Sequence, residues 1–369
     1  MTSILDLARP EARSLPAYNS GLSSEAVRAK YGVSRVARLG SNENPFGPSP
    51  QVALALADLA AGSADYPDAG STALREAVGR MTGIAPDCIV VGNGSEHIIE
   101  MLCQALLAPG DRVVTLIPSF GLHDIYPRMM GAKVDLLPVD AAMQYDVDAW
   151  VRALGQGVKL VFLSNPSNPV GCMLDAAQFR RIVDAMPADG VLVVDEAYYE
   201  YALHSPGFPD TLAELKNRRI HWIVLRTFSK AWGLAGLRVG YGLASGPAFV
   251  DLLNRVRTPF NVNLAAQKAA LAALGDPAHM RAAVLRTLAA RDAMAATLRG
   301  MGLFVAPSAG NFLFFDVKRP NGPVAEGLLA RGVIIKPWKE PGYETYIRVS
   351  IGSDADNALF LDALQAVLG

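Results

Sequence analysis

The sequence has few cysteines, no excess of charge of either sign and no long apolar run. Its 369 residues include three cysteines, Cys88, Cys103 and Cys172, which lie far apart and lack the short Cys or His spacing of a metal site. We therefore expect no metal and three buried, free thiols. A formal net charge of -1 provides no basic surface for nucleic acid or an anionic membrane.

Membrane insertion and secretion are not expected either. The longest apolar runs, such as 158–163 and 191–194, fall far short of the roughly 20 residues that cross a bilayer, and they predict buried strands instead. Residues 1–10 carry Asp6 and Arg9 in a mixed stretch, without the basic end and apolar core of a secretory signal. We expect a cytoplasmic protein, and the length predicts two domains.

Between about residues 85 and 245, short β-branched runs alternate with helical patterns, which is typical of an α/β fold with a mainly parallel sheet. The predicted helices include 96–107 and 176–186. The predicted strands are 89–91, 112–117, 133–137, 159–163, 191–194, 222–225 and 239–243. We predict one large domain, residues 41–265, with a seven-stranded, mainly parallel sheet between helices.

The rest of the chain predicts a second, smaller unit. Helices rich in Ala and Leu at 265–274 and 278–301 are expected to bridge the two domains. They are followed by strands at 311–317, 333–336 and 346–351 and by helices at 324–331 and 354–368. Residues 266–369 therefore predict bridging helices and a small α+β domain. Residues 1–40 are too few to bury a core of their own, so we expect an arm that packs with the small domain.

Three polar sites follow predicted strands. In 92–96, a strand enters a glycine turn and then a helix, so backbone N–H groups at Gly94 and Ser95 favour an anion, although such turns are also common without a ligand. Asn168 lies in a loop with two Asn-Pro steps, where the alternatives are a tight turn and an amide aimed at a ligand. Asp195 ends a buried strand, where a carboxylate is costly unless a cation or several donors meet it.

An acid in the position of Asp195 also occurs beside Mg²⁺ in nucleotide hydrolases. The chain contains no Gly-x-x-x-x-Gly-Lys-Ser/Thr run, and this disfavours that interpretation. The densest polar cluster is 226–240, where Thr227, Ser229 and Lys230 are followed eight residues after the lysine by Arg238. A lysine in an apolar setting loses its proton easily and attacks carbonyls, and arginine offers a two-pronged donor to phosphate. The alternative is a solvated loop with ordinary charges.

Taken together, these stretches resemble the fold-type I pyridoxal-phosphate aminotransferases and, within them, the histidinol-phosphate aminotransferase group. The resemblance covers nearly the whole chain. It rests on motifs at 41–47, 66–67, 92–96, 118–120, 168–171, 195–198, 229–230 with Arg238, and 347–350.

The resemblance implies the cofactor pyridoxal 5'-phosphate and a role for each matching residue. Lys230 would bind the cofactor covalently and move the proton during catalysis, with Asp195 at the pyridine nitrogen and Tyr198 and Asn168 at the ring oxygen. Phe120 would stack on the ring, although core packing alone would also explain an aromatic there. The phosphate would be held by the groups that cluster around it, namely Gly94, Ser95, Thr227, Ser229 and Arg238.

The resemblance also implies a homodimer and a substrate pocket. Tyr66 would reach the phosphate in the neighbouring subunit's site. Arg348 would bind the anionic end of the substrate, with a strand-end surface charge as the alternative. Tyr18 and Asn44 would line the cavity. Lys336 stands where this group usually has a second arginine, so it keeps the positive charge but cannot donate two parallel hydrogen bonds as arginine does. Phe260 stands where a tyrosine is often found.

The resemblance favours amino transfer between L-histidinol phosphate and 2-oxoglutarate, as part of histidine biosynthesis. Aromatic amino acid aminotransferases of the same subgroup are the closest alternative, and a threonine-phosphate decarboxylase-like lyase is a third. A non-catalytic cofactor-binding module is the fourth. Such modules are usually fused to a DNA-binding segment, for which the roughly 40 residues before the first motif leave no room.

Overall fold

The computed structural model describes residues 3–15 and 22–369. Its centre is a seven-stranded sheet with the strand order β2-β8-β7-β6-β5-β3-β4. Five of these strands, β4, β3, β5, β6 and β7, run parallel to one another, whereas β8 runs antiparallel to both of its neighbours, β7 and β2. The strands are β2 (Ile89–Gly92), β3 (Arg112–Ile117), β4 (Lys133–Pro138), β5 (Leu160–Ser164), β6 (Val191–Asp195), β7 (His221–Thr227) and β8 (Gly240–Ala244).

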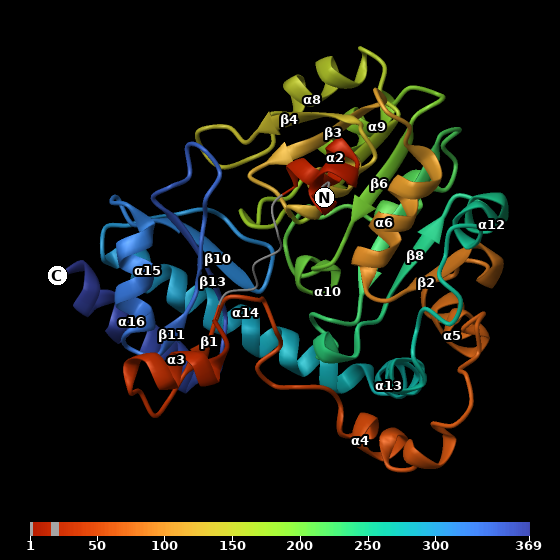
Figure 1. Ribbon diagram of the computed structural model, residues 1–369. Helices are drawn as coiled ribbons and strands as arrows, with labels where there is room; N and C mark the ends of the chain where they lie inside the picture. Colours follow the sequence, from red (N-terminus) through yellow and green to blue (C-terminus); the bar gives the residue numbers. More distant parts are fainter. Residues whose placement is uncertain (1–2, 16–21) are drawn as a thin grey trace.

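Helices cover both faces of this sheet because the side chains of its strands are apolar on both sides (Figure 1). Leu192 and Val194 of β6 pack into the core that α5, α8, α9 and α13 complete. Val191 and Val193 pack against the side chains of α6, α7 and α12 on the other face. These helices are α5 (Thr72–Thr82), α6 (Ser95–Leu106), α7 (Leu122–Met129), α8 (Val147–Leu154), α9 (Ala176–Asp184), α12 (Pro247–Asn254) and α13 (Leu264–Leu274).

The C-terminal part of the chain builds a separate four-stranded antiparallel sheet, with the order β12-β13-β10-β9. Its core also takes apolar residues from the long helix α14, which runs between the two sheets in Figure 1. The elements are α14 (Pro277–Gly300), β9 (Phe304–Val305), β10 (Phe312–Asp316), α15 (Asn321–Leu329), β12 (Lys336–Pro337), β13 (Tyr346–Ser350) and α16 (Asp354–Leu368).

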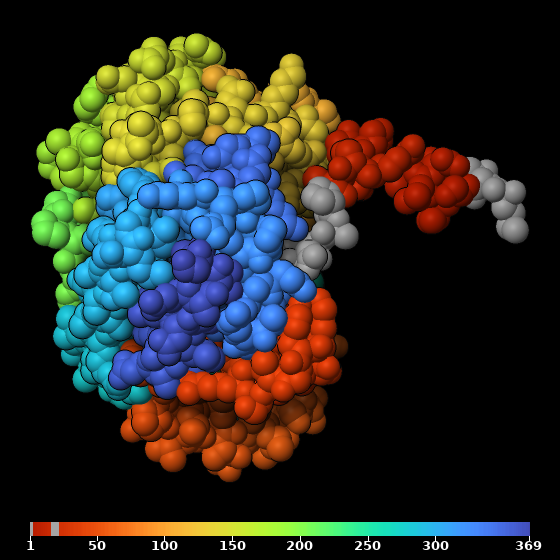
Figure 2. All heavy atoms as spheres, turned by 90° about the vertical axis from the view of Figure 1, so that its left-hand side faces the viewer, coloured from red at the N-terminus to blue at the C-terminus, as the bar shows by residue number. Residues whose placement is uncertain are grey.

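The N-terminal segment returns to this C-terminal unit. The short strand β1 (Ala37–Arg38) pairs in parallel with β11 (Val333–Ile334). Helix α3 (Ser24–Tyr31) lies beside them in Figure 1, capped by Ser23. Residues 3–15, which hold α1 (Ile4–Leu7) and α2 (Pro10–Ser14), project from the body in Figure 2 and contact it where Arg9 donates to the carbonyl of Met129 at 2.9 Å.

Short elements complete the connections. They are α4 (Pro50–Leu56), η1 (Ala60–Gly62), η2 (Pro86–Cys88), α10 (Tyr199–Ala202), α11 (Thr211–Leu215) and η3 (Ala235–Leu237). Across residues 3–15 and 22–369, no helix is both long and apolar enough to cross a bilayer.

The α/β fold class and all seven predicted strands of the large sheet are confirmed, with ends that differ by at most two residues. Two expectations were wrong. The predicted strand 333–336 is two strands in different sheets, because β11 pairs with β1 whereas Lys336 and Pro337 pair with β13. Cys103 and Cys172 are buried free thiols as expected, but Cys88, at the end of η2, is only half-buried.

Candidate active site

One end of the candidate site is an anion cradle, which we call the phosphate cup and define by Gly94, Ser95, Thr227, Ser229 and Arg238. Strand β2 ends at Gly92, and α6 begins at Ser95 after Gly94, whose φ is +79°. Arg238 approaches from the other side, with Nη1 3.4 Å from Ser229 Oγ. The cup therefore combines the positive end of a 12-residue helix with a guanidinium and the hydroxyl groups of Ser95, Thr227 and Ser229.

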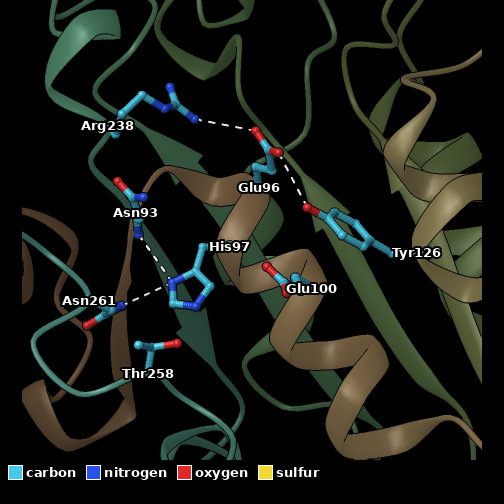
Figure 3. Close-up of a pocket in the computed structure, with 8 residues that line it drawn as sticks. All are labelled: Asn93, Glu96, His97, Glu100, Tyr126, Arg238, Thr258 and Asn261. Atoms are coloured by element: carbon cyan, nitrogen blue, oxygen red, sulfur yellow. Dashed lines mark hydrogen bonds and ion pairs between the residues drawn. The ribbon is translucent and has the colours of Figure 1, made fainter. Parts of the chain in front are cut away.

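Arg238 of the phosphate cup also lines a polar pocket (Figure 3), together with Asn93, Glu96, His97, Glu100, Tyr126, Thr258 and Asn261. In Figure 3, Glu96 lies between Arg238 and Tyr126. Its two carboxylate oxygens accept from Arg238 Nη2 at 3.5 Å and from Tyr126 Oη at 3.4 Å. His97 Nδ1 accepts from the backbone N–H of Asn93 and lies 3.1 Å from Asn261 Nδ2. Burial lowers the pKa of His97, which favours this neutral, accepting form. His97 thus holds the turn that leads into the cup.

We expect Gly94→Ala to weaken cofactor binding by about tenfold to a hundredfold, equivalent to about 1.4–2.8 kcal/mol. A Cβ at Gly94 would lie 2.6 Å from Arg238 Nη2, and the positive φ would also be strained. The comparison variant is Gly110→Ala, because Gly110 has φ +90° but nothing within 4 Å of its Cβ position. Fluorescence titration of both proteins with pyridoxal 5'-phosphate measures the difference. Equal affinities would show that the close approach of Arg238 to Gly94 is unimportant.

At the other end of the site, Asp195 ends β6 and is buried. One carboxylate oxygen lies 3.0 Å from His123 Nε2, and the other accepts from the backbone N–H of Ala197 at 3.0 Å. His123 is fully buried, stacks on Phe162 with ring centroids 4.9 Å apart, and contacts Phe120 edge-on at 5.5 Å. A carboxylate accepts only, so His123 Nε2 carries the proton between them. Two N–H donors, from His123 and Ala197, thus offset the free-energy cost of burying the Asp195 carboxylate, as expected from the sequence.

Lys230 lies between these two ends. Its Nζ donates to the backbone carbonyl of Ser41 at 2.8 Å and lies 6.0 Å from the ring centroid of Tyr198. Burial, and then the positive charge of Arg348, lower the pKa of Lys230 to about 7. An ordinary lysine titrates near 10.4, so a far larger fraction of this amine is neutral and nucleophilic at neutral pH.

Arg348 and Asn168 form the third side of the site. Arg348 Nη1 donates to the amide oxygen of Asn168 at 2.6 Å, and Nη2 donates to the backbone carbonyl of Gly40. Arg348 is buried in β13, so the alternative of a strand-end surface charge is wrong. Lys336 of β12 stands opposite Arg348 in the antiparallel register and is exposed at its outer end. Partial loss of hydration, followed by the charge of Arg348, lowers the pKa of Lys336. Two cations therefore meet at one strand pair.

A buried polar network ties the segment at residues 40–44 to this site. Asn42, at φ +55°, donates from Nδ2 to Tyr198 Oη at 2.9 Å and from its backbone N–H to Ser350 Oγ at 2.7 Å. Asn311 donates to the carbonyl of Asn42 at 3.0 Å. Asn44 donates to the carbonyl of Ala231, beside Lys230, at 2.8 Å. The network joins the N-terminal segment, the large sheet and the C-terminal sheet at one place.

The structure thus brings together Lys230, Asp195, Tyr198, Asn168, Phe120, Arg348, Lys336, Asn44 and the phosphate cup. It does not bring Tyr66 into the site of its own chain: Tyr66 is 80% exposed and stacks on Phe260, with ring centroids 4.4 Å apart. Tyr18 lies outside the described residues.

Sequence reasoning missed His123 and Asn42. His123 follows the motif at 118–120 by three residues. A single histidine forms no sequence pattern that would predict its contact with Asp195. Asn42 was part of a motif, but its role depends on a left-handed backbone conformation and on Ser350, 308 residues away. Both contacts are set by tertiary packing.

The residues present fit the pyridoxal phosphate that the sequence resemblance implies. Glycine at 94 and at 240 keeps the phosphate cup free of side chains, since a Cβ at Gly240 would lie 2.5 Å from the amide nitrogen of Ser95. A buried carboxylate at Asp195 suits a protonated ring nitrogen, and a neutral amine at Lys230 suits an aldehyde. Among the described residues, no group of His, Cys, Asp and Glu is arranged to hold a metal ion.

Comparison with known proteins agrees with this arrangement. The sequence model of the family Aminotransferase class I and II matches residues 34–364. Histidinol-phosphate aminotransferase 3 of Rhizobium meliloti is 46% identical over 97% of both chains, and histidinol-phosphate aminotransferase 1 of Mesorhizobium japonicum is 46% identical over 100% of both. The crystal structure of histidinol-phosphate aminotransferase from Sinorhizobium meliloti in complex with pyridoxal-5'-phosphate has a TM-score of 0.89, at 29% identity, and covers 97% of this chain and 96% of that one.

Proposed function

The chain belongs to the class I and II aminotransferases, and on this premise we propose that it transfers the amino group of L-histidinol phosphate to 2-oxoglutarate. The products are imidazole acetol phosphate and L-glutamate, and the cofactor is pyridoxal 5'-phosphate. The observation that carries the choice of donor is the pairing of Lys336 with Arg348 across β12 and β13. Two cations at one strand pair suit a phosphate, which bears more charge than a carboxylate.

Each residue of the site has a task in this reaction. When bound, pyridoxal 5'-phosphate withdraws electrons from the donor Cα and carries the amino group between the two half-reactions. Lys230 Nζ accepts the proton from the donor Cα, which its pKa of about 7 permits at neutral pH. Asp195 holds a proton on the ring nitrogen, and His123 orients the Asp195 carboxylate. The phosphate cup fixes the opposite end.

Arg348 and Lys336 bind the anionic end of the donor, and Asn168 orients the Arg348 guanidinium. The Trp338 ring centroid lies 6.0 Å from that guanidinium, so a flat apolar surface adjoins the anion site. Such a surface suits the imidazole of histidinol phosphate, and it equally suits the ring of an aromatic amino acid. An aromatic amino acid aminotransferase is therefore the second candidate.

A donor panel separates the two candidates. With 2-oxoglutarate as acceptor, we expect kcat/KM for L-histidinol phosphate to exceed that for phenylalanine, tyrosine and aspartate by at least tenfold, because only histidinol phosphate uses both cations. Steady-state glutamate formation measures this. A kcat/KM for phenylalanine tenfold above that for histidinol phosphate would contradict the proposal and favour the second candidate.

Lys336→Met serves as the internal control of this panel. It removes one cation but keeps the length of the side chain, so it should lower kcat/KM for histidinol phosphate by about tenfold, as expected for one charged hydrogen bond. The value for phenylalanine should stay within about twofold.

We also propose the division of the chain expected from the sequence: an N-terminal arm at 1–40, a large cofactor-binding domain at 41–265, and bridging helices with a small domain at 266–369. The separate core of the C-terminal sheet and the pairing of β1 with β11 support it. Cytoplasmic location stays a prediction.

The proposed assembly is a homodimer in which Tyr66 reaches the neighbouring subunit's phosphate cup. Support comes from the exposure of the stacked pair of Tyr66 and Phe260, 80% and 40%, since aromatic side chains that are exposed together are typical of contact surfaces. Sedimentation of the cofactor-loaded protein tests this, and a monomer at micromolar concentration would contradict it.

A further inference from the structure

A buried ion pair joins the two strands that carry both ends of the cofactor site. Glu196, just after β6, is 0% exposed, and Arg226, near the end of β7, is 4% exposed. Both Nε and Nη2 of Arg226 lie 2.8 Å from the same Glu196 oxygen, Oε2. The guanidinium carbon also lies 3.4 Å from the ring centroid of Tyr199, which begins α10. Glu196 therefore holds one edge of the guanidinium, and the Tyr199 ring covers one of its faces.

The pair lies on the face of the sheet opposite the cofactor residues. In the register of β6 and β7, Asp195 stands opposite Leu225, and the backbone N–H of Glu196 donates to the Leu225 carbonyl at 2.8 Å. Side chains alternate along a strand, so Asp195 and Thr227 share one face while Glu196 and Arg226 share the other. Each member of the ion pair is thus one residue away from a cofactor-binding residue on its own strand.

Stability does not explain why charged residues occupy these positions. A buried ion pair gains little over apolar side chains of similar volume, because removing two charges from water cancels most of their attraction. Aromatic groups already pack here, since the Tyr199 ring covers the guanidinium, and Tyr241, which pairs with Arg226 in the sheet register, contacts Phe228. The buried carboxyl of Glu200 is a further charged neighbour of Arg226. The best-attested use of such a pair is to specify one register among several.

We propose that Glu196 and Arg226 are positioning residues that set the separation between Asp195 and the phosphate cup. A rigid ligand that is held at both ends requires one fixed distance between Asp195 and the phosphate cup. The ion pair lies on the opposite face of the sheet and holds the ends of β6 and β7 in the positions that give this distance. The pair does not contact the cofactor and acts through Asp195 and Thr227. The inference rests on the proposed function only in requiring pyridoxal phosphate chemistry, and not on the identity of the donor.

The test compares a probe that spans both ends with one that binds a single end. The variant Glu196→Met with Arg226→Met replaces the pair by apolar side chains of similar length. Pyridoxamine 5'-phosphate spans the site without a covalent bond to Lys230, whereas inorganic phosphate occupies the cup alone. We expect calorimetric titration to show pyridoxamine 5'-phosphate binding weakened tenfold or more and phosphate binding changed by less than about twofold. The melting temperature of the cofactor-free protein should stay within a few degrees of wild type.

Unchanged affinity for pyridoxamine 5'-phosphate in the double variant would overturn the proposal, and so would an equal loss for both probes, which would indicate general damage. If the double variant does not fold, the single variant Arg226→Lys takes its place in the same titrations. It keeps the charge but cannot donate from two nitrogens, so it should still bind pyridoxamine 5'-phosphate severalfold more weakly, and wild-type affinity would overturn the proposal. Arg35→Met, which breaks the partly exposed pair with Asp356 of α16, should leave both affinities unchanged.

These measurements use no amino donor, so they distinguish this inference from the proposed function. A different preferred donor would leave every expected affinity as stated. A wild-type protein that bound no pyridoxamine 5'-phosphate would contradict the cofactor assignment and the inference together.

Discussion

Lys230→Ala is expected to lower kcat for every donor by at least about 10³-fold, because it removes the proposed proton-transfer group and covalent attachment point. General base catalysis alone contributes about 10²–10⁴-fold. The Lys230 amine has a pKa of about 7 and lies between Asp195 and the phosphate cup. None of the cup residues changes in the variant. The cofactor should therefore still bind, with its phosphate held by Arg238 and the start of α6.

Two measurements check this prediction. Glutamate formation gives the loss of turnover, and borohydride reduction followed by mass spectrometry shows whether the cofactor is covalently attached. The control is Lys216→Ala, since Lys216 is exposed after α11, and it should retain normal rates and normal attachment. More than a tenth of wild-type activity in Lys230→Ala would exclude Lys230 as the reacting amine.

Asp195→Asn is expected to lower kcat by about 10²–10³-fold, the usual effect of removing one fixed electrostatic group from a buried site. The amide keeps the shape of the carboxylate, and its single oxygen can still accept from either His123 or the Ala197 backbone, but not from both. It lacks the negative charge that, in the proposed mechanism, holds a proton on the ring nitrogen of the cofactor. The change therefore removes the charge and one hydrogen-bond acceptor while it leaves the size of the side chain almost the same.

The readouts for Asp195→Asn are kcat with the best donor and the affinity for inorganic phosphate. The phosphate affinity should not change, because the cup lies at the other end of the site. Asp184→Asn, which alters an exposed acid paired with Arg218, is the matched control. An effect on kcat below tenfold would mean that the charge of Asp195 is not used in catalysis.

The large sheet could be predicted because its strands are apolar on both faces and are separated by clear helical patterns. The division of 333–336 into two strands could not be predicted, because the sequence from Val333 to Lys336 is continuous and strand-like. Only the pairing of Val333 with the N-terminal segment separates it from Lys336. The short helices α1–α3 were also missed, since each has at most eight residues and carries no periodic pattern long enough to recognise.

The candidate site followed the same rule. Asp195, Lys230 and Arg238 were predictable because strand ends, glycine turns and apolar flanks mark them locally in the sequence. The contact between His123 and Asp195 bridges 72 residues, and that between Arg348 and Asn168 bridges 180. No local pattern records such distances, so the partners that orient a group are harder to predict than the group itself.

The carbonyls of Gly40 and Ser41 have a consequence for selectivity. They accept hydrogen bonds from Arg348 and Lys230, so neighbouring carbonyls of one short segment hold the Arg348 cation and the Lys230 amine. An incoming ligand therefore displaces a backbone carbonyl from the cation and not a water molecule. A neutral analogue would replace one neutral acceptor by another and gain almost nothing, whereas an anion gains the difference between a neutral and a charged hydrogen bond. Discrimination against uncharged analogues thus begins in the resting protein, before any substrate arrives.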